Sequence, residues 1–107
     1  MRIELLYFDG CPSHHAFRPQ LQRILDLAGI TATVEERRVE SDADAQRKRF
    51  LGSPTLRVDG VDVDPGAGER TDYGLKCRLY HTDEGLRRTP RDEWVLKAVQ
   101  QTRASTD

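Results

Sequence analysis

The chain has 107 residues, which is enough to bury one hydrophobic core and too few for two domains. Charged residues make up 33% of the sequence, yet the formal net charge is only −1. This near-neutral balance excludes the strongly basic surface with which proteins bind nucleic acid or an anionic membrane. No segment approaches the roughly 18 apolar residues of a membrane span, and the N-terminus lacks the pattern of a secretory signal. We therefore predict a single cytoplasmic domain over residues 1–107.

The N-terminal part of the chain predicts a strand followed by a long helix. Residues 3–8 are apolar at most positions on both faces, which is typical of a strand in the middle of a covered sheet. Pro12 is well placed in the first turn of a helix, where its missing N–H is not needed. Apolar residues at helical spacing continue this helix to a stop at Gly29, and Pro19 inside it is expected to kink the axis.

The rest of the chain predicts shorter elements. Ser41 begins a capping-box sequence that marks the start of a helix, and Asp59-Gly60 is a strong signal for a two-residue hairpin turn. In chain order, the expected elements are a strand over 30–39, a helix from Ser41 to about residue 50, hairpin strands over 54–58 and 61–63, a loop over 64–75, a short strand over 77–80 and a final helix from about Asp92. We expect the tail from about Thr102 to be frayed.

These elements follow one another in the order β-α-β-α-β-β-α. A strand, a helix and a strand in succession form a parallel pair with a right-handed crossover, and a hairpin adds antiparallel strands to the same sheet. We therefore predict an α/β fold with a central mixed sheet of about four strands flanked by helices.

The sequence Cys11-Pro12-Ser13-His14 places a cysteine where the first strand gives way to the first helix. The unpaired N–H groups and the positive dipole end at a helix N-terminus favour a thiolate, which is the nucleophilic and metal-binding form of cysteine. His14 comes three residues later, so its ring can return to the same end of the helix. It would stabilise the thiolate as a cation or accept its proton as a neutral base. The alternative is a buried, unreactive Cys11 beside a solvent-exposed His14.

Two segments resemble conserved parts of the thioredoxin superfamily. Residues 8–14 resemble the family's active-site segment, in which a Cys-x-x-Cys sequence opens the first long helix. The sequence Gly-Ser-Pro-Thr over 52–55 is similar to the loop that carries the family's cis-proline. The resemblance implies the thioredoxin-like fold, a cis bond between Ser53 and Pro54, and a position of this loop against Cys11.

Four segments together resemble a group of small bacterial thioredoxin-like proteins, some of which are selenoproteins and some of which carry an alkylmercury lyase label. The segments are Phe-Asp-Gly-Cys-Pro, Gly-Ser-Pro-Thr, Val-Asp-Val-Asp-Pro and Tyr-Gly-Leu-Lys-Cys-Arg-Leu-Tyr. The resemblance implies a thiol-based redox protein that needs no cofactor, with Cys11 as the nucleophile and with Ser53 and Pro54 beside it. It also implies a partner that is a small thiol or disulfide, or a protein thiol.

Three departures from the thioredoxin pattern argue against a general dithiol reductase. His14 stands in place of the second active-site cysteine, so Cys11 cannot form the usual disulfide within that motif. Leu5 stands in place of the buried acid that accepts a proton in thioredoxin, and Gly10 replaces the tryptophan before the motif.

Cys77 is the candidate for the missing second thiol. If Pro54 starts at the active-site end of the sheet, the turn at Asp59-Gly60 lies at the far end, and the returning strand brings the following loop back towards Cys11. Cys77 follows that loop and is predicted to act as a resolving thiol, provided that the two Cα atoms come within about 7 Å. The alternative for Cys77 is a small buried hydrophobic residue on a strand.

Two other classes of function stay open. Cys11, His14 and Cys77 could together hold a soft metal or process an organomercurial. His81 would lie about 13 Å along a strand from Cys77, which is too far to share one ion. The chain could also be a thioredoxin fold kept as a non-catalytic interaction module.

Asp62 and Asp64 alternate with two valines, so both carboxylates point to the same side of the predicted hairpin. We expect this side to face the solvent. The alternative is that one of the carboxylates helps Cys11, for example as a proton relay.

Overall fold

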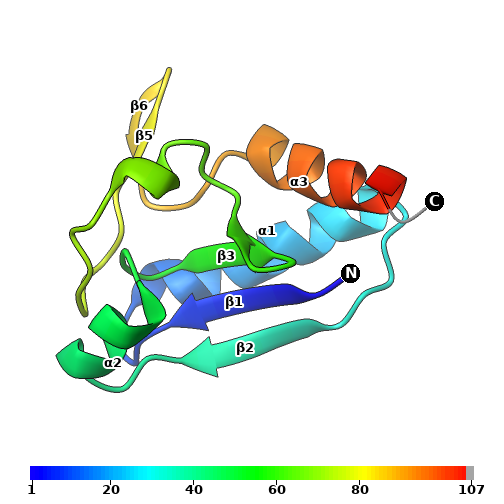
Figure 1. Ribbon diagram of the computed structural model, residues 1–107. Coiled ribbons are helices and arrows are strands. Elements are labelled where there is room, and N and C mark those ends of the chain that lie inside the picture. Colours follow the sequence, from blue (N-terminus) through cyan, green and yellow to red (C-terminus); the bar gives the residue numbers. More distant parts are fainter. Residues whose placement is uncertain (106–107) are drawn as a thin grey trace.

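A four-stranded mixed sheet lies at the centre of the computed structural model, which describes residues 1–105 (Figure 1). β1 pairs in parallel with β2 and antiparallel with β3, and β3 pairs antiparallel with β4. The order across the sheet, with the bounds of each strand, is β2 (Val34–Arg38), β1 (Ile3–Tyr7), β3 (Thr55–Val58) and β4 (Val61–Asp62). The predicted α/β class, element order and mixed sheet are confirmed, and the arrangement is that of a thioredoxin-like fold.

Helices cover both faces of this sheet. The helices α1 (Pro12–Leu27) and α3 (Asp92–Ser105) contact each other on one face, where they enclose the larger core with Leu5. The short helix α2 (Asp42–Lys48) packs on the other face, against Leu6. This division follows from the alternation of side chains along β1, which sends neighbouring leucines to opposite faces. Within residues 1–105, no helix combines the length and the apolar character needed to cross a membrane.

The ends of several elements differ from the prediction. β2 begins at Val34, because the chain from Gly29 onwards first closes the end of α1, where the Ile30 N–H donates to the Leu25 carbonyl oxygen at 2.9 Å. The helix α2 starts as predicted, since the Ser41 side chain accepts the Asp44 N–H. It ends earlier than predicted, at Lys48, because the residue that follows adopts a left-handed conformation.

The segment after β4 contains elements that the pattern did not predict. A 3-10 turn, η1 (Ala67–Glu69), lies in the expected loop. The strand expected over 77–80 is instead a single bridge at Cys77, followed by the separate hairpin β5 (Tyr80–Thr82) and β6 (Gly85–Arg87). This hairpin projects from the rest of the molecule (Figure 1).

The helix α3 continues beyond the expected end of ordered structure. It extends through Ser105, so residues 102–105 lie within the helix. The last part of the tail that was predicted to be frayed, residues 106–107, lies outside the described residues.

Candidate functional site

Cys11 lies at the N-terminus of α1, shortly after the end of β1. It is the N-cap residue of the helix, and Pro12 occupies a position in the first turn where its missing N–H leaves no hydrogen bond unmade. The backbone N–H groups of Ser13 and His14 at the start of α1 lower the pKa of the Cys11 thiol, although its side chain makes no capping hydrogen bond. Cys11 is only 1% exposed, so its thiol is enclosed by the protein.

The loop before β3 lies against Cys11. The peptide bond between Ser53 and Pro54 in this loop is cis, as the resemblance predicted. The Cys11 thiol donates a hydrogen bond to the Ser53 carbonyl oxygen, with 3.5 Å between sulfur and oxygen. Ser53 is fully buried, and its hydroxyl has no hydrogen-bond partner among the described residues. This hydroxyl is therefore available to donate a hydrogen bond when a neighbouring group becomes negatively charged.

Cys77 reaches the same loop from a segment far along the chain. It forms an isolated parallel bridge with Ser53. In this bridge the Ser53 N–H donates to the Lys76 carbonyl oxygen at 2.8 Å, and the Arg78 N–H donates to the Ser53 carbonyl oxygen at 3.0 Å. The pairing leaves 3.9 Å between the sulfurs of Cys77 and Cys11. Both cysteines are free thiols, and the prediction that the chain brings Cys77 close to Cys11 is confirmed.

The two thiols differ in their electrostatic surroundings. Burial alone would raise the pKa of Cys11, but interactions with Ser53 and with the backbone N–H groups of His14 and Ser13 outweigh burial and lower this pKa below its ordinary value. Burial raises the pKa of Cys77, and the nearby negative charge of Cys11 raises it further. Cys11 is therefore the thiol that ionises first, and the Ser53 hydroxyl is positioned to donate to the resulting thiolate.

Replacing Ser53 with alanine is expected to raise the pKa of Cys11, because the thiolate loses a hydrogen-bond donor in a buried site. The ionised fraction of Cys11 at neutral pH should fall. The NMR shift of the Cys11 Cβ carbon, followed against pH in a Cys77→Ser background, measures this pKa. Ser13→Ala is the matched control, since Ser13 acts through its backbone N–H and alanine keeps that group. An unchanged titration midpoint in Ser53→Ala would contradict the assignment.

The ring of His14 makes its contacts with residues outside the cysteine pair. Its imidazole ring stacks on Tyr7, with 4.0 Å between ring centroids, and Nε2 lies 2.9 Å from the Glu36 carboxylate. The ring is buried rather than solvent-exposed, so the alternative that left His14 on the surface is wrong. The backbone N–H of His14 still serves the Cys11 sulfur. The role of the His14 ring in tuning the Cys11 thiol stays a prediction.

Arg78 is a residue of the site that sequence reasoning did not single out. Its side chain is fully buried, with Nη1 at 2.7 Å from Asp62 and Nη2 at 3.2 Å from Asp64. Nη1 also donates to Thr55 Oγ1 at 3.0 Å, and the guanidinium carbon lies 4.3 Å from the centre of the Tyr80 ring.

The partners of Arg78 correct the prediction for the two aspartates. The expected solvent-facing side is wrong, because Asp64 is buried and Asp62 is half-buried against the guanidinium. The sequence signal for this pairing was available: two carboxylates lie on one side of a predicted strand, and an arginine follows later in the chain. Together these ion pairs hold the side chain of Arg78, the residue that follows Cys77, in one position.

The metal interpretation does not fit the geometry. Among residues 1–105, no group of three or more His, Cys, Asp and Glu side chains is arranged to hold a metal ion. The three side chains proposed as ligands, Cys11, His14 and Cys77, do not form such a group. His81 lies on β5 and is exposed.

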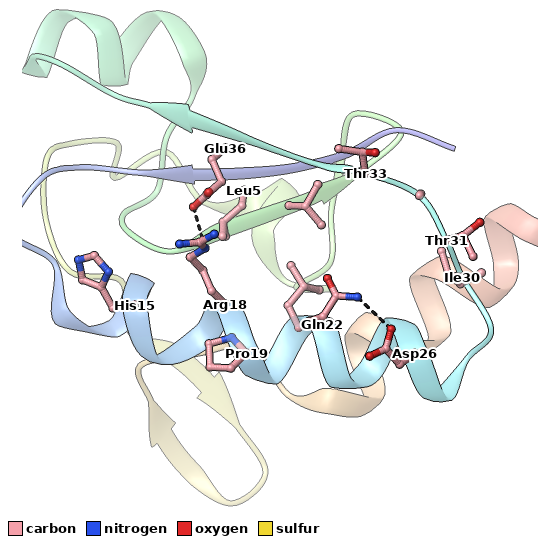
Figure 2. A pocket seen from close by; sticks show the side chains of 13 residues that line it. Leu5, His15, Arg18, Pro19, Gln22, Asp26, Ile30, Thr31, Thr33 and Glu36 are labelled. Carbon is pink, nitrogen blue, oxygen red and sulfur yellow. Dashed lines mark hydrogen bonds and ion pairs between the residues drawn. The ribbon is translucent and has the colours of Figure 1, made fainter.

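A groove between α1 and β2 is separate from the cysteine pair (Figure 2). Its lining, among the described residues, includes neither cysteine. On its walls Arg18 lies 3.1 Å from Glu36, and Gln22 donates a hydrogen bond to Asp26 at 2.9 Å. Figure 2 shows these two interactions as dashed lines.

No family model matches the chain, and comparisons with curated proteins and with solved structures found no significant match. The site is therefore interpreted from its own geometry. The resemblance to small thioredoxin-like proteins stays a prediction from the motifs.

Proposed function

We propose that the chain is a thiol–disulfide redox protein of thioredoxin type, in which Cys11 and Cys77 form a reversible internal disulfide. The observation that carries this proposal is the 3.9 Å separation of the two sulfurs. A disulfide joins sulfurs about 2.0 Å apart, so closure requires an approach of about 2 Å. The two cysteines come from segments that are hydrogen-bonded to the same residue, Ser53, which supports a preformed pair.

The roles of the residues follow from their surroundings. Cys11 is the attacking sulfur when the bond closes, because its pKa is lowered and a thiolate is the nucleophile. Ser53 and the helix N-terminus stabilise that thiolate. The external partner is a small disulfide or a protein thiol. The compartment in which we expect this protein to work is the cytoplasm, where cysteine pairs are normally kept reduced.

The test is equilibration of the protein in glutathione buffers of increasing oxidation, followed by acid quenching and peptide mapping. The expected product is one species in which the peptides of Cys11 and Cys77 are joined. Cys11→Ser and Cys77→Ser are the controls, and neither can give this species. Two free thiols throughout the series, or only mixed disulfides with glutathione, would refute the proposal.

A further inference from the structure

The two cysteines differ in how far an outside molecule can reach them. Cys11 is 1% exposed and lies beneath the loop of Ser53, whereas Cys77 is only half-buried. Leu75 and Leu79, which lie two residues before and after Cys77, are 38% and 41% exposed, whereas Arg78, the neighbour of Cys77, is fully buried. A disulfide exchange reaction needs the attacking sulfur, the central sulfur and the leaving sulfur in line, so access decides which sulfur takes part.

We propose that the external partner exchanges at Cys77, and that Cys11 serves only the internal step. This inference rests on the proposed redox function and reverses the order of events expected from the motif, in which Cys11 would meet the partner first. The geometry supports it because a partner sulfur can approach the half-buried cysteine from solvent. The same approach to Cys11 would require the segments of Ser53 and Cys77 to separate.

The chemistry of the two sulfurs agrees with this order. In thiol–disulfide exchange, a thiol of lower pKa is the better leaving group, and a thiol of higher pKa is the stronger nucleophile once ionised. Cys11 has the lowered pKa and Cys77 the raised one. An attack on the internal disulfide at Cys77 therefore expels the sulfur that leaves more easily.

Reduction then proceeds in two balanced steps. A partner thiolate attacks the Cys77 sulfur, the bond between the two cysteines breaks, and its electron pair leaves on Cys11 as a thiolate. A second partner thiolate attacks the partner sulfur of this mixed disulfide, which releases the partner disulfide and leaves Cys77 as a thiolate that takes up a proton. The protein disulfide and two thiols thus become the protein dithiol and one disulfide. Oxidation of the protein is the reverse sequence.

The first experiment uses the variants Cys11→Ser and Cys77→Ser, each of which keeps one cysteine. Both are mixed with oxidised glutathione over a range of pH, and mass spectrometry follows the mixed disulfide. The rate constant per thiolate is expected to be more than about tenfold larger for Cys77 than for Cys11. Equal rates, or a faster reaction at Cys11, would overturn the proposal. Cys11→Ala repeats the comparison with a residue that needs no hydrogen bond, in case serine disturbs the buried position.

The second experiment uses the wild-type protein with its internal disulfide formed. Reduced glutathione is added, the reaction is quenched with acid at short times, and the transient mixed disulfide is located by peptide mapping. Glutathione is expected on the peptide that contains Cys77, and its presence on the Cys11 peptide would overturn the proposal. The first experiment does not need the internal disulfide. If that bond never forms while Cys77 still reacts faster, the proposed function fails and the site of exchange stands.

Discussion

The variant Arg78→Met is expected to lose about 3 kcal/mol of unfolding free energy, because it removes one partner from a buried ion pair. The stability is lost because two carboxylates remain in place after their cationic partner has been removed. Asp62 and Asp64 would face each other without the guanidinium that now lies 2.7 Å and 3.2 Å from their oxygens. A domain of this size has a total stability of about 5 to 15 kcal/mol, so the effect is a large share of the whole. Urea unfolding of the reduced protein measures it.

The matched control for Arg78→Met also removes the two carboxylate charges that this variant leaves unpaired. The triple variant with Asp62→Asn and Asp64→Asn should recover a large part of the lost stability, since no uncompensated carboxylate is then buried. Arg78→Lys should fall between the wild type and Arg78→Met, because lysine keeps the charge but cannot reach two carboxylates with a planar fork. Wild-type stability in Arg78→Met would show that the ion pairs contribute nothing net.

The variant Gly52→Ala is expected to weaken the internal disulfide by about tenfold to a hundredfold in its equilibrium constant against glutathione, through strain of about 1 to 3 kcal/mol. A Cβ atom at this position would lie 2.9 Å from the Cα of Arg78, closer than ordinary contacts allow. Gly52 also has a φ of +123°, a conformation that alanine rarely adopts. The segment of Cys77 would have to move away from Ser53, and with it the second sulfur.

Gly85→Ala separates the clash in Gly52→Ala from backbone strain alone. Gly85 has a similar φ of +101°, but a Cβ atom there would meet nothing within 4 Å. This control should leave the disulfide equilibrium at its wild-type value. If Gly52→Ala and Gly85→Ala behave alike in glutathione buffers, the close approach of Arg78 to Gly52 does not position the second cysteine.

The elements that could be predicted are those whose signals are local. The apolar pattern of β1 and the helical spacing of α1 were sufficient to predict these elements, because the periodicity of each lies within its own residues. The hairpin of β5 and β6 was missed because it has no apolar alternation. Its turn is held instead by the Thr82 hydroxyl, which donates to the Gly85 carbonyl oxygen and accepts the Glu84 N–H. Side-chain hydrogen bonds of this kind leave little trace in a hydropathy pattern.

In the candidate site, too, the features with local sequence signals could be predicted and the others could not. The position of Cys11 at a helix start and the cis bond before Pro54 follow from short motifs. The contact with Cys77 required only the direction of the hairpin. The burial of Arg78 depended on the register that sets it opposite Asp62 and Asp64, and no short motif encodes that register.

The hydrogen bonds of Ser53 limit how another molecule can be recognised here. Exposed backbone N–H and carbonyl groups often let a foreign peptide dock as an additional strand. At Ser53 both groups are already bonded to Lys76 and Arg78 of the same chain, so that position is taken. A partner in the exchange that we propose at Cys77 therefore cannot dock as a strand on the backbone of Ser53.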